Sequence, residues 1–214
     1  MGRLVLGQSV DESLKSIGDF FMKKDDVHQT MRRLSDRLKQ ENIPYAIIGG
    51  MAMNLHGFRR VTGDVDVLTT REGLDAIHER LIGRGYVPKF PGARKRIRDT
   101  ATGIDIDFIT TGEYPGDGKP KPVVFPDPAE AVIRDGIEVL DLPKVIELKI
   151  ASGLSSEERY LLDLGDVQKL ISELRLPRDL AEQLDPSVRP EYLRMWEAWK
   201  NRPTTAPDYE PYEP

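Results

Sequence analysis

Two aspartates at alternate positions of one apolar segment are the residues of this chain best suited to chemistry. Asp64 and Asp66 alternate with Val65 and Val67, so on a β-strand both carboxylates point to the same side. Carboxylates held this close repel each other unless a cation or a proton lies between them. Since Mg²⁺ prefers hard oxygen ligands, the pair is a candidate metal site.

A second acidic segment further along the chain repeats this alternation. Asp105 and Asp107 lie between apolar neighbours in the run from Ile104 to Phe108. A carboxylate from a neighbouring strand would complete a two-metal clamp, which neutralises a triphosphate and activates an attacking hydroxyl. Both acids share one expected face, so their spacing alone leaves the choice between them open.

A glycine pair precedes the first acidic strand. Gly49 and Gly50 follow an expected strand and open an expected short helix. Glycines let the backbone approach a ligand closely, and a helix start presents free N–H groups to phosphate. Groups suited to phosphate and to metal therefore lie on consecutive elements.

The segment from Ile48 to Val67 resembles the signature of the polymerase-β-like nucleotidyltransferase superfamily. That signature is an apolar residue, a glycine pair, a gap of roughly 9–13 residues and then Asp-apolar-acid-apolar. A finer pattern, similar to small bacterial nucleotidyltransferases of the AbiEii-like group, is met by Gly49, Gly50, Ala52, Gly57, Arg60, Thr62, Asp64 and Asp66. A later segment resembles the helical part of that group and contains Lys149, Arg159, Asp163 and Asp166.

The resemblance implies an α+β nucleotidyltransferase fold, with a short mixed β-sheet flanked by helices and a C-terminal helical bundle. It also implies transfer of NMP from an NTP to a hydroxyl, with release of pyrophosphate. The catalytic, metal-binding residues would be Asp64, Asp66 and Asp107, with Mg²⁺ or Mn²⁺ as cofactor. Asp107 is favoured over Asp105 because its surroundings best match the apolar-acid-apolar strand of the family. The nucleotide-binding residues would be Gly49, Gly50, Arg60, Thr62 and Lys149.

Several of these residues also have a purely structural interpretation. Arg60 and Thr62 could pin the loop before the strand, and the stem of Lys149 could pack along its helix. Arg159, Asp163 and Asp166 share one helix face, which suits a salt-bridged tether as well as a site. The three histidines have neither zinc-ligand spacing nor a nucleophile partner, and we expect each to be structural or exposed.

Hydrophobic periodicity and turn signals predict the elements that position these residues. Helices are expected at 11–23, 25–41, 50–56, 71–81, 142–152, 157–174, 177–184 and 190–201, and strands at 45–48, 64–69, 87–90, 94–99, 104–110, 131–134 and 137–140. The Gly/Pro-rich segment 111–128 is expected to be a loop that covers or lines a site. We expect N-terminal helices (1–42), a catalytic core (43–140), a helical part (141–202) and a disordered acidic, Pro-rich tail (203–214).

Composition narrows the classes of function. The 214 residues carry a formal net charge of -5, which argues against a protein that coats nucleic acid, so a nucleic acid is expected only as a tRNA acceptor. The absence of cysteine excludes thiolate chemistry. No apolar run suits a membrane span, and a cytoplasmic protein is expected. The run from Ile82 to Arg98 has six basic residues and no acid; it is either a solvated face or a wall that attracts an anionic substrate.

The acceptor hydroxyl stays unidentified at this point. It could belong to a small molecule such as an aminoglycoside, to a tRNA 3′ end or to a protein side chain. A toxin role with an antitoxin partner follows only from the resemblance. Two other hypotheses are a non-catalytic nucleotide-binding or interaction module on the same fold, and a structural calcium site.

Overall fold

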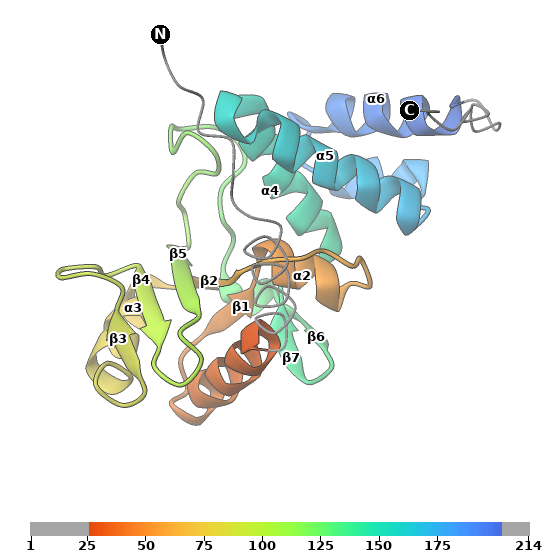
Figure 1. The fold of residues 1–214 in the computed structure, drawn as a ribbon. Coiled ribbons are helices and arrows are strands. Elements are labelled where there is room, and N and C mark those ends of the chain that lie inside the picture. The colour runs from red at the N-terminus through yellow and green to blue at the C-terminus, as the bar shows by residue number, and fades with distance from the viewer. Residues whose placement is uncertain (1–25, 203–214) are drawn as a thin grey trace, which may run out of the picture. The chain divides into compact units, whose positions relative to one another are not determined.

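The chain has an α+β architecture built on one seven-stranded mixed sheet (Figure 1). The computed structural model describes residues 26–202, so the expected helix at 11–23 and the expected tail at 203–214 lie outside the described residues. Two compact units divide the chain. The first contains the described residues up to Glu113 together with Phe125–Val145, and the second contains Tyr114–Val124 and the chain from Ile146 onward. The expected α+β class is confirmed.

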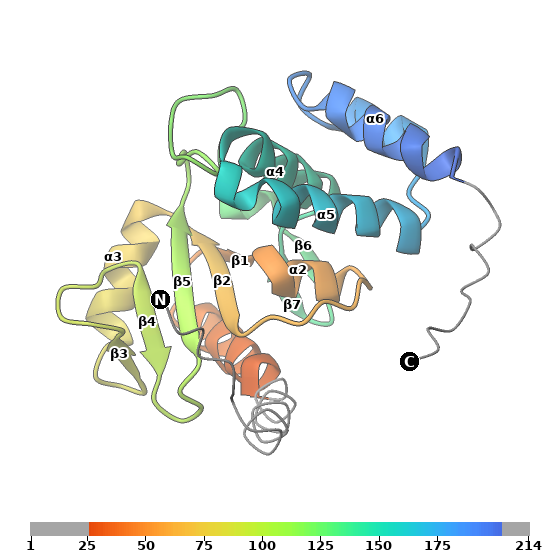
Figure 2. The same cartoon turned by 45° about the horizontal axis from the view of Figure 1, so that its top comes forward.

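The sheet of the first unit combines parallel and antiparallel pairs in the order β3-β4-β5-β2-β1-β7-β6 (Figure 2). Its strands β2 and β5 are parallel, as are β1 and β7, and the other neighbours are antiparallel. The strands are β1 (Tyr45–Ile47), β2 (Asp64–Thr69), β3 (Tyr86–Pro88), β4 (Arg96–Asp99), β5 (Asp105–Thr110), β6 (Val132–Arg134) and β7 (Ile137–Val139). Each expected strand is present, with ends shifted by one or two residues.

Two helices lie on one face of this sheet (Figure 2). The helix at residues 26–40 has an apolar stripe whose members are all buried: Val27, Met31, Leu34 and Leu38. Helix α3 (Arg71–Arg80) begins at Thr70, whose hydroxyl accepts a hydrogen bond from the amide of Gly73 at 2.9 Å. This face therefore forms the core of the first unit.

The alternation of β2 and β5 sorts their side chains between core and surface. Val65 and Val67 are fully buried, whereas Asp64 and Asp66 lie half-buried on the opposite face. The same pattern runs along β5, where Ile106 is buried and its acidic neighbours are half-buried. All the candidate carboxylates consequently lie on the face that the two helices leave uncovered.

The hairpin β6–β7 extends the sheet at its far edge. Its turn residues Asp135 and Gly136 both have positive φ, at 47° and 76°, as a two-residue type I′ turn requires. Its attachment to the sheet is the parallel pairing of Ile47 with Val139. Nothing in the sequence pattern predicts that pairing.

The second unit is helical. Helix α4 (Leu142–Ser155) begins in the first unit and ends here, and is followed by α5 (Glu157–Glu173), the 3₁₀ helix η2 (Arg178–Gln183) and α6 (Arg189–Lys200). Helix α5 buries the stripe Leu164, Val167, Leu170 and Ile171. From 111 to 127 the chain has no helix or strand, as expected, and a short 3₁₀ helix η1 (Pro128–Glu130) follows. Among the described residues, no helix has the length and apolar character that crossing a bilayer requires.

Candidate metal centre

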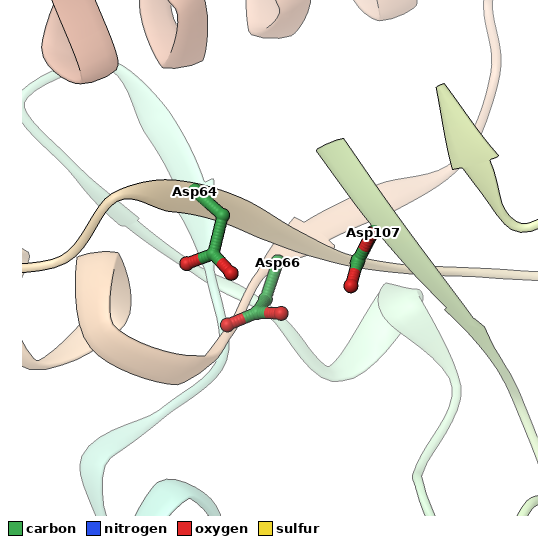
Figure 3. A group of neighbouring side chains, drawn as sticks. All are labelled: Asp64, Asp66 and Asp107. Atoms are coloured by element: carbon green, nitrogen blue, oxygen red, sulfur yellow. The ribbon is translucent and has the colours of Figure 1, made fainter. Parts of the chain in front are cut away.

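The parallel register of β2 and β5 brings three aspartates together. Asp64 pairs with Asp105 and Asp66 with Asp107 along the two strands. Asp64, Asp66 and Asp107 each offer one carboxylate oxygen, and these three oxygens lie within 4.8 Å of one another. In Figure 3 the two aspartates of β2 lie side by side and Asp107 faces them from β5. Spacing predicts Asp64 and Asp66, the resemblance favours Asp107 as the third residue, and strand pairing brings Asp107 beside them.

Asp105 and Asp107 differ in how their charges are balanced. Asp105 is held by Lys89 and Arg98, each with a nitrogen 2.8 Å from a carboxylate oxygen. The hydrogen bond from Arg98, together with Lys89, lowers the pKa of Asp105 despite its partial burial. This carboxylate therefore already has cationic partners within the chain, and it is not a member of the cluster.

Asp107 lacks such a close pairing. Burial raises its pKa, Arg96 opposes that shift, and the nearby charge of Asp64 adds to it. The Arg96 Nε atom lies 3.4 Å from Oδ2 of Asp107, while its Oδ1 is buried with no hydrogen-bond partner among the described residues. A buried carboxylate oxygen without a partner is costly. The geometry favours Asp107 as the third carboxylate.

The donor set fits a hard divalent cation. It consists of carboxylate oxygens only, which Mg²⁺ and Mn²⁺ prefer over nitrogen and sulfur donors. A cation there would screen the repulsion among the three charges. Asp64, Asp66 and Asp107 are thus the residues that could hold a metal.

The glycine pair packs tightly against this cluster and its supporting loop. Gly49 has φ +62°, and a Cβ built on it would come within 2.9 Å of the carboxylate carbon of Asp66. A Cβ on Gly50 would lie 2.9 Å from both Arg60 Nη1 and Thr62 Cβ. A side chain at either position would therefore collide with a candidate site residue. The signature residues therefore pack against one another, and the glycines leave space for the carboxylates and the loop.

The loop before β2 is tied to the first carboxylate. The Thr62 hydroxyl donates a hydrogen bond to Asp64 Oδ1 at 2.8 Å. Asn54, which the motif analysis did not single out, binds both backbone groups of Arg60. A lone asparagine near a helix end gave no signal in the sequence, because its partner lies in a loop whose path the sequence does not show.

The basic run from Ile82 to Arg98 is matched by acids of the same unit. Arg94 pairs with Asp75 and Lys95 with Glu113, while Lys89, Arg96 and Arg98 lie beside Asp105 or Asp107. Five of its six basic side chains therefore have an acidic neighbour. Two of the three histidines are held by backbone contacts, since His56 binds the carbonyl of Leu140 and His78 that of Arg94.

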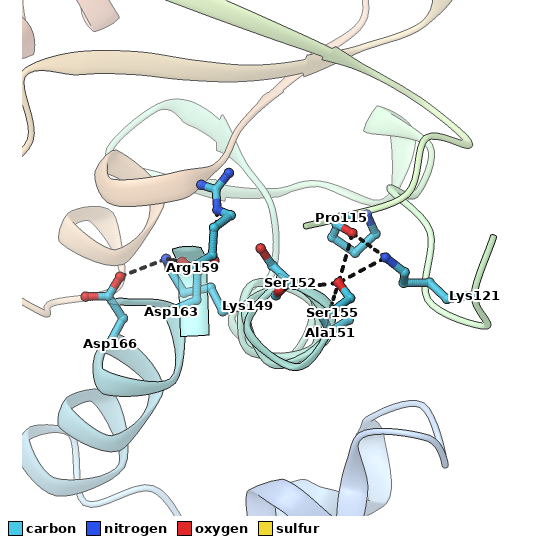
Figure 4. Close-up of polar contacts among 9 residues, drawn as sticks. All are labelled: Pro115, Lys121, Lys149, Ala151, Ser152, Ser155, Arg159, Asp163 and Asp166. Carbon is cyan, nitrogen blue, oxygen red and sulfur yellow. Dashed lines mark hydrogen bonds and ion pairs between the residues drawn. The ribbon is translucent and has the colours of Figure 1, made fainter. Parts of the chain in front are cut away.

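Lys149 belongs to the second unit, where it joins two helices (Figure 4). Its ammonium lies 2.8 Å from Asp163 Oδ1 and 2.8 Å from Asp166 Oδ2. Arg159 adds a contact of 3.2 Å to the other oxygen of Asp163. Burial alone would raise the pKa of Asp163, but its ion pairs and hydrogen bonds, that with Lys149 foremost, together lower it. Of the two interpretations of this helix face, the contacts favour the tether between α4 and α5.

Comparisons with known proteins give distant structural similarity only. No protein-family model matches the chain, and neither does any curated protein. The crystal structure of JHP933 from Helicobacter pylori is similar at 17% identity and a TM-score of 0.44, over 80% of this chain and 77% of that one. An antigenic nucleotidyltransferase-like protein from Paracoccidioides brasiliensis is similar at 16% identity and a TM-score of 0.45, over 69% and 76% of the two chains.

A third similar structure is that of a complex. ANT(2")-Ia, in complex with adenylyl-2"-tobramycin, is similar at 13% identity and a TM-score of 0.34, over 74% of this chain and 80% of that one. Similarity at this level does not assign an activity or an acceptor to the chain. We therefore base the functional proposal on the geometry of its own residues.

Proposed function

We propose that this protein is a metal-dependent nucleotidyltransferase that transfers NMP from an NTP to a hydroxyl of an acceptor molecule. One observation carries the proposal: three carboxylate oxygens converge within 4.8 Å from paired strands, and Asp107 keeps a buried oxygen that has no partner within the described chain. Three carboxylates gathered at this distance repel one another, so the arrangement suits an incoming cation. The glycine, arginine and threonine packed around it fit a phosphate-bearing substrate.

The residues divide into three roles. Asp64 and Asp66 hold the cation from the rigid strand β2, with Asp64 oriented by Thr62. A bound Mg²⁺ or Mn²⁺ would neutralise charge on the triphosphate and lower the pKa of the attacking hydroxyl. Asp107, whose pKa is raised by burial, is the candidate base for the hydroxyl proton. The hydroxyl oxygen bonds to the α-phosphorus, the bond from the α-phosphorus to the bridging oxygen breaks, and pyrophosphate leaves with that electron pair.

Arg60 and Thr62 are the candidate triphosphate contacts. Both pack against Gly50, and an arginine can bind phosphate oxygens with two parallel hydrogen bonds. Gly49 and Gly50 leave the backbone there without side chains, so a phosphate can approach it. Lys149 differs from these residues, because its ammonium is already paired with Asp163 and Asp166.

The decisive experiment measures NTP binding by calorimetry and transfer with radiolabelled NTPs, each with and without Mn²⁺. Asp64→Asn and Asp66→Asn should abolish metal-dependent binding and transfer, while Asp105→Asn serves as the matched control on the same sheet face. Incubation of the labelled NTPs with a cell extract then shows whether label enters RNA, protein or small molecules.

Two outcomes would contradict the proposal. NTP binding that survives the loss of both acids, without transfer to any acceptor, would favour the non-catalytic module. Tight Ca²⁺ binding to the three aspartates without any NTP binding would favour a structural calcium site.

A further inference from the structure

Asn54 near the end of α2 (Gly49–Leu55) makes a paired contact with the loop that leads to β2. Its side-chain Nδ2 donates a hydrogen bond to the carbonyl of Arg60 at 2.8 Å. Its Oδ1 accepts a hydrogen bond from the amide N–H of the same residue, also at 2.8 Å. One side-chain amide thus binds both backbone groups of one loop residue, which fixes the position and the orientation of that peptide.

The path of the loop explains how the chain, after leaving α2, brings Arg60 back beside that helix. Gly57 has φ 93°, a conformation that favours glycine, and it turns the chain back at the end of α2. The amide of Phe58 then bonds to the carbonyl of Met53 at 2.9 Å, and the Phe58 side chain is buried. Beyond Phe58 the loop is more open, with Val61 47% exposed. The Asn54 contact therefore anchors the loop where its apolar anchoring ends.

The anchored residue is the one that presents its guanidinium to the glycine turn. Arg60 Nη1 lies 2.9 Å from the position that a Cβ of Gly50 would occupy. Two residues later, Thr62 contacts the same glycine and bonds to Asp64. A shift of the Arg60 peptide would therefore move the guanidinium away from the turn beside the metal cluster.

We infer that Asn54 is a positioning residue that acts through Arg60, holding its guanidinium where it can bind the triphosphate of the substrate. This inference rests on the proposed function, because it assigns Arg60 to the triphosphate. A purely structural role would make Asn54 one of the tethers of α2. In the structural role, loss of the Asn54 side chain lowers only stability, whereas in the positioning role it also weakens triphosphate binding.

A second tether on the same helix end provides the matched control. His56 binds the carbonyl of Leu140 through Nε2 at 2.8 Å, and that contact does not involve the Arg60 loop. His56→Ala and Asn54→Ala both remove a side-chain-to-backbone tether of α2. Both variants are expected to lower the melting temperature, whereas only Asn54→Ala is expected to weaken triphosphate binding.

The experiment is calorimetric titration of inorganic triphosphate in the presence of Mn²⁺, a probe that needs no knowledge of the base. Removing two neutral hydrogen bonds suggests a loss of about tenfold in affinity for Asn54→Ala. Arg60→Ala should lose at least as much. Because Asn54 acts through Arg60, the double variant should bind no more weakly than Arg60→Ala alone, so the two losses should not add.

The outcomes separate this inference from the proposed function. If the wild-type protein binds no triphosphate with Mn²⁺, the proposed function fails. If it does bind, the inference is overturned by unchanged affinity in Asn54→Ala, by an equal loss in His56→Ala, or by additive losses in the double variant. Asn54→Leu removes both hydrogen bonds while keeping a similar volume, and it replaces the alanine variant if that variant unfolds.

Discussion

The two units of this protein each contain a group of aspartates, and the groups are balanced in opposite ways. In the second unit, Asp163 and Asp166 both pair with the ammonium of Lys149, and the Lys149 side chain is only 12% exposed. In the first unit, Asp64, Asp66 and Asp107 direct oxygens toward one another. The difference appears in the pKa values: pairing with Lys149 lowers that of Asp163, whereas burial raises that of Asp107.

This comparison distinguishes acids that stabilise the fold from acids that suit a ligand. A carboxylate with a buried lysine beside it has its counter-charge in the sequence, so its interactions are complete once the chain folds. A carboxylate with a buried, unpartnered oxygen is complete only when something from outside binds. The number of acidic residues does not distinguish the two groups. The distinction is that one group has the lysine Lys149 between its carboxylates.

Removal of the lysine that balances the aspartates of the second unit should have the largest effect. Lys149→Met leaves Asp163 and Asp166 buried without their partner, and such a loss lowers the free energy of unfolding by about 3–5 kcal/mol. Chemical denaturation measures it. Arg159→Met is the control, since the Arg159 side chain is 55% exposed and its loss should lower the free energy of unfolding by at most about 1 kcal/mol. A Lys149 variant of normal stability but weak NTP binding would assign the lysine to the nucleotide instead.

Supplying a cation to the first unit should have the next largest effect. Mn²⁺ at one hundred times its dissociation constant should raise the free energy of unfolding by about 2.7 kcal/mol, and EDTA should reverse the rise. Thermal unfolding with increasing Mn²⁺ measures it. Asp66→Asn should remove most of the gain, while Asp105→Asn should keep it. An equal metal response in both variants would show that the three-aspartate cluster is not the site.

Replacing one acid in each unit by its amide should give stability changes of opposite sign. Without metal at neutral pH, Asp107→Asn should raise the free energy of unfolding, by no more than about 1 kcal/mol, because it removes a charge that burial disfavours. Asp163→Asn should lower it, because Lys149 loses part of its counter-charge. Chemical denaturation of both variants in EDTA measures the two stability changes. A loss of stability in Asp107→Asn would contradict the expected difference in sign.

The pH dependence of the same variants sharpens the contrast. The raised pKa of Asp107 means that its protonated form favours the fold; that contribution is complete below the ordinary value of 3.8 and is lost as pH rises through the folded-state pKa. The lowered pKa of Asp163 means that its contribution is present above 3.8 and is lost as pH falls through the folded-state pKa. In acid, Asp107→Asn should therefore lose its gain in stability over the wild type. Asp163→Asn should likewise lose its stability deficit. Thermal unfolding of each variant and the wild type across pH measures both changes.

The sequence predicted the elements well because their signals are local. The stripe from Val27 to Leu38 and the alternation around Asp64 and Asp66 depend only on spacing, and the structure has both a helix and a strand there. The strands expected at 131–134 and 137–140 depend on local signals in the same way, and the structure has β6 and β7 there. Element ends lie within two residues of the expected ones, except that α4 continues three residues further, to Ser155; caps and frayed turns set such ends.

What the sequence left open depends on pairing between distant segments. Choosing Asp107 over Asp105 on physical grounds required the knowledge that Lys89 and Arg98 lie beside Asp105. The tether of Lys149 and the clamp of Asn54 required the paths of α5 and of the Arg60 loop. Periodicity cannot supply such information, because it describes one element at a time.

The in-register pairing of β2 with β5 makes the three-aspartate cluster unusually sensitive to chain length. A one-residue insertion between Asp105 and Ile106 would place Ile106 opposite Asp66 and turn Asp107 toward the core, since a slip of one residue exchanges the two faces of a strand. Insertions in the loop after Glu113 leave this alignment unchanged. Lineages of this protein should therefore vary in loop length while keeping the lengths of these two strands constant.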